Sequence, residues 1–288
     1  MTKYKRNHHI PVFMLNYWTS KPANSPYTGI WVYEIDSRRK YFANAQGSSA
    51  YTFAISNDLY IPTIEGERAT AMERWFSNLE GTLADFASQT HKHQETLSLN
   101  KSEDILKLLA ALFALECRSP SMIQQFQTIF ASLDTVPRPD ELLSHQLALE
   151  NVINYVNECA ARFSLGHMLL LYCEEPKVLL SDRPTFNHSE ITHKFFVLTS
   201  KVVVALSEEM QGNGFVYRYE EQEQEILDLL NKKIALQAGV WIASTTESQL
   251  DQYIPVFDSD EWKKYRYSTK AKPVFESKKG WKIVPDDK

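Results

Sequence analysis

The change in hydrophobic spacing near residue 166 constrains the fold of this chain more than any other feature of its sequence. Before it, apolar residues such as Met72, Phe76 and Leu79 recur every three or four positions, which is the pattern of one apolar helix face. After it, the run 168–173 is continuously apolar, which is typical of a buried strand. This order predicts an α+β fold, with a mainly helical bundle packed against a small, mostly antiparallel β-sheet.

Spacing, proline positions and turn residues predict the individual elements. Helices are expected over 67–89, 102–118, 122–132, 140–166 and 220–244. Strands are expected over 29–34, 40–43, 51–55, 168–173, 178–180, 194–198, 201–206 and 215–219. We expect one α+β domain over residues 1–260, followed by a peripheral C-terminal extension over 261–288.

The amino-acid composition limits the classes of protein to which this chain can belong. With 43% hydrophobic and 23% charged residues, the 288-residue chain is ordinary for a globular protein. A net charge of −5 gives no general attraction to nucleic acid or to membranes, so any such contact must be local. No signal peptide and no membrane span is expected. Three widely spaced cysteines fit buried thiols rather than disulfides, which favours a cytoplasmic protein.

Two adjacent histidines, His8 and His9, precede Ile10-Pro11 near the chain start. Imidazole titrates near neutral pH and can act as a general acid, a general base or a metal ligand, so both are candidate catalytic residues. The alternative is structural, because such a pair can also hydrogen-bond to neighbouring carbonyl groups. Pro11 fixes the backbone here and predicts a strand mouth or a rigid turn.

Carboxylates and an amide complete the candidate catalytic set. Glu73 and Glu80 lie seven residues apart on an expected helix, so both project from one stripe, and Glu80 borders the apolar face. Asp182 ends a buried strand, where many enzymes place a carboxylate, although Ser-Asp-Arg-Pro is also typical of a tight turn. Asn231 is a poor helix former inside an expected helix, which indicates a specific hydrogen bond, either structural or catalytic.

Two arginines are candidates for binding substrate. Arg118 precedes Ser119-Pro120, where it could hold an anion at the start of the next helix or simply end its own helix. Arg6 closes the basic stretch 3–6, which could contact nucleic acid or be solvated surface. The chain has no HExxH, CxxC, GxSxG or Walker motif, which disfavours a preformed zinc site, that route of acyl transfer and P-loop hydrolysis.

Several of these residues lie in four stretches with a recognisable pattern. They are His8-His9-Ile10-Pro11 with Ile30-Trp31-Val32-Tyr33, the helix with Glu73 and Leu79-Glu80, Leu180-Ser181-Asp182-Arg183-Pro184, and Leu230-Asn231-Lys232-Lys233-Ile234-Ala235 with Ala238. Over about residues 6–245 the chain resembles the domain of unknown function 4238 family of microbial proteins. The resemblance implies a fold and a set of positions, and no reaction.

Histidines, carboxylates, arginines and an amide are compatible with phosphodiester cleavage, in which His moves protons while Arg or a divalent ion balances phosphate charge. We therefore predict a hydrolase, most plausibly a nuclease acting on RNA or DNA, with Mg²⁺ or Mn²⁺ as its candidate cofactor. A role in microbial defence is the expected setting. The alternative is a non-catalytic binding or regulatory module in which the His-His-x-Pro and Ser-Asp-Arg-Pro motifs are structural.

Overall fold

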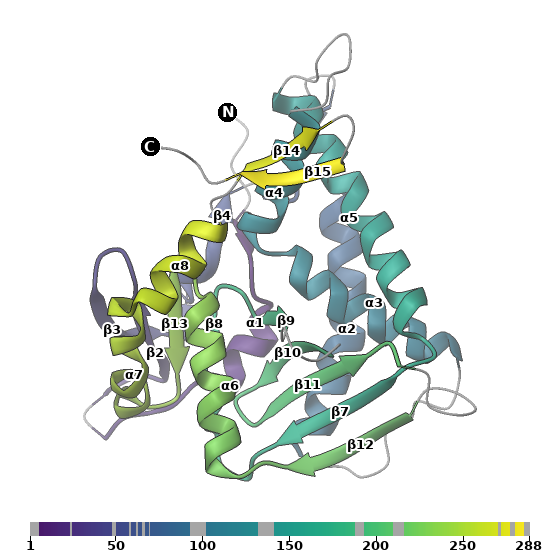
Figure 1. The fold of residues 1–288 in the computed structure, drawn as a ribbon. Coiled ribbons are helices and arrows are strands. Elements are labelled where there is room, and N and C mark those ends of the chain that lie inside the picture. The colour runs from purple at the N-terminus through teal and green to yellow at the C-terminus, as the bar shows by residue number, and fades with distance from the viewer. Residues whose placement is uncertain are drawn as a thin grey trace.

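The computed structural model of the chain is shown in Figure 1. It describes residues 6–23, 25–47, 50–57, 59–61, 63–64, 67–68, 70–92, 102–131, 141–187, 193–209, 216–269, 272–276 and 280–284. Within these residues, helices gather on one side of a sheet, and a second sheet with its own helices lies beside the first (Figure 1). This arrangement confirms the predicted α+β class, with two larger sheets where one was expected.

Four long helices form the bundle, in which α3 packs against α2 and α5, and α4 against α5. The helices are α1 (Val12–Leu15), α2 (Ala71–His91), α3 (Ser102–Cys117), α4 (Pro120–Ala131), α5 (Glu141–Phe163), α6 (Gln224–Gln237), α7 (Glu247–Tyr253) and α8 (Asp260–Thr269). Proline and acidic residues account for two of the boundaries. Pro120 opens α4, where a missing N–H costs nothing, and acidic residues in the first turn of α3 suit its dipole.

The five-stranded sheet has the order β12-β7-β11-β10-β9, and the four-stranded sheet has the order β3-β2-β13-β8. The larger-sheet strands are β7 (His167–Tyr172), β9 (Thr185–Asn187), β10 (His193–Thr199), β11 (Val202–Ser207) and β12 (Val216–Glu221). The four-stranded sheet contains β2 (Gly29–Glu34), β3 (Arg39–Asn44), β8 (Leu180–Ser181) and β13 (Trp241–Ser244). Only the β12–β7 pair of these two sheets is parallel. The sheets are therefore mostly antiparallel, as predicted.

Three short pairings complete the described strands. They join β1 (Arg6–His8) to β4 (Ile55–Asn57), β5 (Thr63–Ile64) to β6 (Glu67–Arg68), and β14 (Lys272–Glu276) to β15 (Gly280–Val284), each antiparallel. The first pair positions the N-terminal histidines, because β1 has no other strand partner among the described residues.

The larger sheet contacts the bundle through both apolar and charged side chains. Phe113 of α3 meets Phe196 of β10 edge-on, with ring centroids 5.4 Å apart. Lys194 Nζ lies 2.6 Å from Glu116 Oε1, so a buried ion pair ties the same two elements together. Both phenylalanines are fully buried, which places the core between the bundle and this sheet.

The prediction of one helix over 220–244 is wrong. Residues 216–221 form edge strand β12, helix α6 ends at Gln237, and 241–244 form β13, which lies between β2 and β8. The periodic spacing suggested a continuous helix. Instead, the N–H groups of residues 239–241 donate hydrogen bonds to the side chain of Asp182 rather than to carbonyl groups of a preceding helical turn. A distant carboxylate thus binds the N–H groups that follow α6.

Two smaller expectations also change. Most of the expected strand 51–55 is a 3-10 turn over Thr52–Ala54, and only Ile55 begins β4. The helix expected from residue 67 begins at Ala71, because Glu67–Arg68 pairs as β6. Within the expected C-terminal extension, Trp262 of α8 is buried and its indole N–H donates to Ala238 O at 3.3 Å.

All three cysteines are buried and reduced, as predicted, and burial raises the pKa of the Cys117 and Cys173 thiols. In the described part of the chain, every helix is too short or too polar to cross a membrane.

Replacement of Phe196 by Ala is expected to lower the free energy of unfolding by about 3–5 kcal/mol, because it opens a cavity in the fully buried contact with Phe113. Leu229→Ala is the matched control: this side chain is 61% exposed, and its loss should change stability by less than about 0.5 kcal/mol. Urea unfolding followed by circular dichroism measures both. Equal effects would contradict the placement of the core.

Candidate functional site

Arg118 lies at the centre of the candidate site, just after the last residue of α3. Its guanidinium is buried, pairs with the Glu80 carboxylate of α2, and donates from Nη2 to the His8 carbonyl oxygen of β1 at 3.1 Å. The rings of Tyr60 and Phe76 lie 5.5 and 5.2 Å from the guanidinium carbon, at cation–π distance. One arginine therefore joins β1, α2 and the α3–α4 junction.

The strand β1 also contacts α2 at a second position, two helical turns before Glu80. Asn7 is buried, and its side-chain amide donates to Glu73 Oε1 at 3.4 Å. Glu73 and Glu80 lie two turns apart on α2, as their spacing predicted. Glu73 contacts β1 directly through Asn7, whereas Glu80 is joined to β1 through Arg118. We use the name Arg118 cluster for Asn7, His8, His9, Glu73, Glu80 and Arg118.

His9 is the most unusual titratable group of the Arg118 cluster. The side chain is 8% exposed, and its Nε2 lies 2.6 Å from the Ser56 hydroxyl of β4. Its Nδ1 is buried and has no hydrogen-bond partner among the described residues. Burial, and then the nearby His8 and Arg118, lowers the pKa of His9 to about 4. The imidazole is therefore neutral at neutral pH, which is the form that accepts a proton or binds a metal.

The two other N-terminal candidates are less well defined. The His8 ring is half-buried, while its backbone carbonyl accepts from Arg118. Arg6 begins β1, but its side chain lies outside the described residues, so the predicted substrate contact is not placed. Pro11 ends the strand segment and sits at the N-cap of α1, which agrees with the rigid turn expected there.

Asp182 occupies a different part of the fold, directly after β8. Its Oδ1 accepts the backbone N–H groups of Gly239, Val240 and Trp241 at 2.9, 3.0 and 3.4 Å. Burial raises the pKa of the carboxyl, while these N–H groups and the neighbouring Arg183 act against that rise. No hydrogen bond or ion pair among the described residues joins Asp182 to the Arg118 cluster. Its bonds shape the turn between α6 and β13.

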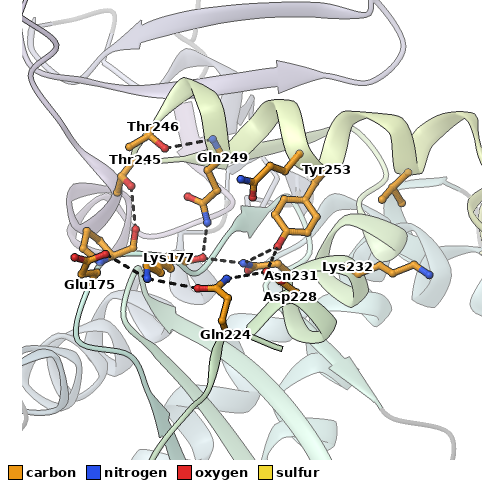
Figure 2. A pocket seen from close by; sticks show the side chains of 13 residues that line it. Glu175, Lys177, Gln224, Asp228, Asn231, Lys232, Thr245, Thr246, Gln249 and Tyr253 are labelled. Carbon is orange, nitrogen blue, oxygen red and sulfur yellow. Dashed lines mark hydrogen bonds and ion pairs between the residues drawn. The ribbon is translucent and has the colours of Figure 1, made fainter. Parts of the chain in front are cut away.

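Asn231 is held in place in a similar way. Its Oδ1 accepts the N–H of Leu179 at 2.8 Å, and its Nδ2 donates to the carbonyl of Lys177 at 2.8 Å. Figure 2 shows it among the residues that line a cavity, with Tyr253 and Asp228 beside it. The cavity has a volume of about 1020 Å³, and most of its lining residues are of polar type. The sequence indicated a specific bond for this helical asparagine. Its described hydrogen bonds connect α6 to the segment before β8.

A second, smaller cavity of about 240 Å³ lies next to the Arg118 cluster along the chain. Its lining includes Arg183 and Ser119, which caps α4 by accepting the Met122 N–H at 3.2 Å, and also Glu116, whose carboxylate pairs with Lys194. Arg183 Nε is buried with no hydrogen-bond partner in the described part of the chain. A helix N-terminus beside a guanidinium is suited to an anion.

The described side chains do not form a preformed metal site with three or more protein ligands. Among the residues that the structure describes, no group of three or more His, Cys, Asp or Glu side chains could hold a metal ion. Within the Arg118 cluster, His9 Nδ1 is buried without a hydrogen-bond partner among the described residues, and both carboxylates already contact Asn7 or Arg118.

Five of the predicted candidates therefore come together: His8, His9, Glu73, Glu80 and Arg118. Sequence analysis missed Asn7, Ser56 and Tyr60, which contact this group. Asn7 carried a readable signal, because it directly precedes the two histidines in the sequence. Ser56 and Tyr60 carried none, since their contacts arise only from the β1–β4 pairing and the packing of α2.

A model of the family described as "Protein of unknown function (DUF4238)" matches residues 6–248 of the chain. No curated protein and no solved structure matches it.

Acidification is expected to destabilise the protein through His9. Its folded pKa of about 4 lies below the ordinary value of 6.5, so the unfolded chain binds this proton first as the pH falls. The contribution of neutral His9 to the free energy of unfolding is complete above pH 6.5. As the pH falls toward 4, the free energy of unfolding decreases by about 3 kcal/mol through this group. Urea unfolding of wild type and His9→Gln across this range measures it. An identical slope in both proteins would contradict the assignment.

Asp182→Ala is expected to lower the free energy of unfolding by about 3 kcal/mol, because it leaves buried N–H groups before β13 without an acceptor. Asp258→Ala is the control, since that side chain is 64% exposed and its ion pair with Arg38 lies at the surface. Chemical unfolding compares the two. A loss below about 1 kcal/mol for Asp182→Ala would exclude the structural role.

Proposed function

The chain belongs to the DUF4238 family of proteins of unknown function, and we propose that it is a hydrolase that cleaves phosphodiester bonds in RNA or DNA at the Arg118 cluster. The single observation that carries the proposal is the buried, neutral His9, whose Nδ1 has no partner among the described residues, beside a buried guanidinium. Such a pair can move a proton next to a negatively charged group.

His9 has the role of general base in this proposal. When its Nε2–H donates to Ser56, the lone pair on Nδ1 is left to accept a proton from the attacking hydroxyl or water. A pKa of about 4 is low for a base at neutral pH, but one cause of it is the positive charge of Arg118. A phosphate beside Arg118 offsets that charge, so substrate binding raises the basicity of His9.

Phosphate binding is proposed for Arg118 and the neighbouring small cavity. Arg118 already pairs with Glu80, so a phosphate at this guanidinium competes with a carboxylate. In the cavity, Arg183 and the Ser119-capped start of α4 provide donors for a second phosphate of a polynucleotide backbone. Local groups of this kind are needed, because the chain as a whole has a net charge of −5.

Mg²⁺ or Mn²⁺ is proposed as a cofactor that arrives with the substrate, since Mg²⁺ commonly binds through one or two carboxylates together with phosphates. Glu73 and Glu80 are the carboxylates near the histidines. The proposal further places the protein in the cytoplasm, in a microbial defence role in which it degrades nucleic acid.

The second candidate is a non-catalytic module, and one observation favours it. Arg118 binds the backbone carbonyl of His8 and Asp182 binds backbone N–H groups, so both motifs make bonds that stabilise the fold. In this alternative, the same contacts hold the N-terminal strand against the bundle and present a surface to a partner.

Cleavage of labelled RNA and DNA, single- and double-stranded, by the purified chain in Mg²⁺, Mn²⁺ or EDTA tests the proposal. We expect His9→Gln to lower the rate by roughly 100-fold or more while the protein stays folded. His91→Gln is the matched control, because this half-buried histidine also hydrogen-bonds to a hydroxyl, that of Thr199 at 3.1 Å. Arg183→Ala should raise KM more than it lowers kcat.

Absence of cleavage by wild type on every substrate and in every metal condition would overturn the nuclease proposal. Loss of cleavage in the control as well as in His9→Gln would show that His9 has no particular role. If His9→Gln fails to fold by circular dichroism, the interlocking role of the second candidate is favoured.

A further inference from the structure

Two histidines outside the Arg118 cluster meet at one end of the larger sheet. His167 begins β7 and His193 begins β10, and the pairing register places both opposite Ser207, the last residue of the intervening strand β11. Residues directly opposite each other in antiparallel strands project to the same face. Since Ser207 is small, the two imidazoles can converge above it.

The imidazoles lie very close together. Their Nε2 atoms are 3.3 Å apart, and the ring centroids are 5.3 Å apart at an interplanar angle of 68°. The Nδ1 atoms of both rings are buried and have no hydrogen-bond partner among the described residues. A ligand between the two Nε2 atoms leaves both Nδ1 atoms as they are, so the observation that bears on a shared ligand is the Nε2–Nε2 spacing.

We propose that His167 and His193 form a binding site for a divalent transition metal, with Zn²⁺ as the preferred ion. Two imidazole nitrogens bound at about 2.0–2.1 Å with a tetrahedral angle between them are separated by about 3.3 Å. The observed Nε2–Nε2 separation equals this distance. The side chains thus hold the two nitrogens at the spacing of a chelate without any movement of the strands.

The choice of ion follows from the ligands. Neutral imidazole suits borderline metals such as Zn²⁺ and Cu²⁺ and disfavours Mg²⁺ and Ca²⁺, which take oxygen ligands. The two imidazoles are the protein ligands of this site, since no third His, Cys, Asp or Glu side chain among the described residues joins them in a metal-binding group. Water supplies the remaining ligands, so the metal keeps open positions.

The surroundings limit the motion of His193. Its ring lies 6.4 Å from the ring of Phe195, two residues along the same strand, and Phe195 is stacked on Phe186 of β9 at 4.8 Å. A metal shared by β7 and β10 bridges two strands that are separated by β11. Metal binding would therefore cross-link two strands of the larger sheet. The site is independent of the proposed nuclease chemistry, because it shares no residue with the Arg118 cluster.

Titration of the EDTA-treated and desalted full-length chain with ZnCl₂ by isothermal calorimetry tests the proposal. We expect one equivalent to bind to wild type, with affinity reduced at least 10-fold in His167→Gln and in His193→Gln. His91→Gln should bind as wild type does, since His91 contacts Thr199 rather than another histidine. Zinc should also raise the thermal midpoint of wild type and of His91→Gln, because a ligand that binds only the folded state stabilises it.

A second measurement needs no substitution of the pair. Carbethoxylation of histidines by diethyl pyrocarbonate, mapped by mass spectrometry on wild type, should fall at His167 and His193 when zinc is present and stay constant at His91. Zinc binding that persists unchanged in both substituted proteins, or protection at His8 and His9 instead, would overturn the proposal. Failure of wild type to bind zinc would overturn it too, leaving the pair as a hydrogen bond, with the nuclease test unaffected.

Discussion

The buried guanidinium of Arg118 is the interaction on which the N-terminal part of the structure depends. A charge inside a protein must be paired and hydrogen-bonded, or its desolvation outweighs what it contributes. Here the pairing comes from Glu80, the hydrogen bond is accepted by the His8 carbonyl, and two aromatic rings lie at cation–π distance. Because these partners come from separate elements, the arginine fixes where the strand β1 lies against α2 and, through it, where His9 is buried.

Hydrophobic spacing predicted most of the secondary structure, because the helices of the bundle and the strands of the larger sheet each bury one continuous apolar surface. It failed over 220–244, where the spacing of apolar residues suits a helix throughout. After Gln237, the N–H of Gly239 is accepted by Asp182, which lies 57 residues before that glycine. Gly239 is itself a local signal of a helix end, whereas its bond to Asp182 leaves no pattern in the segment.

The candidate site was predictable only where its residues are of unusual type for their position in the sequence. Adjacent histidines, a glutamate at the border of an apolar face and an arginine at a helix end are each unusual, and the fold brings His9, Glu80 and Arg118 together. Asp182 and Asn231 were equally unusual, yet their described bonds are to backbone groups, apart from a longer bond of 3.4 Å from Asn231 to the Tyr253 hydroxyl. A polar residue that serves the backbone and one that serves a substrate have the same sequence signature, because both must escape the cost of unpaired burial.

The same arginine that organises the fold also sets the chemistry of His9. Burial, then the nearby His8 and then the charge of Arg118 lower the pKa of His9 and keep the imidazole neutral, so an anion that offsets the arginine charge removes one of these three causes. Glu80 supplies only one such anion, and it reaches the guanidinium from α2. A phosphate entering from the side of Ser119 and Arg183 would add a second, and would couple substrate binding to the basicity of His9. A histidine with a low pKa is thus consistent with catalysis that begins only once substrate has arrived.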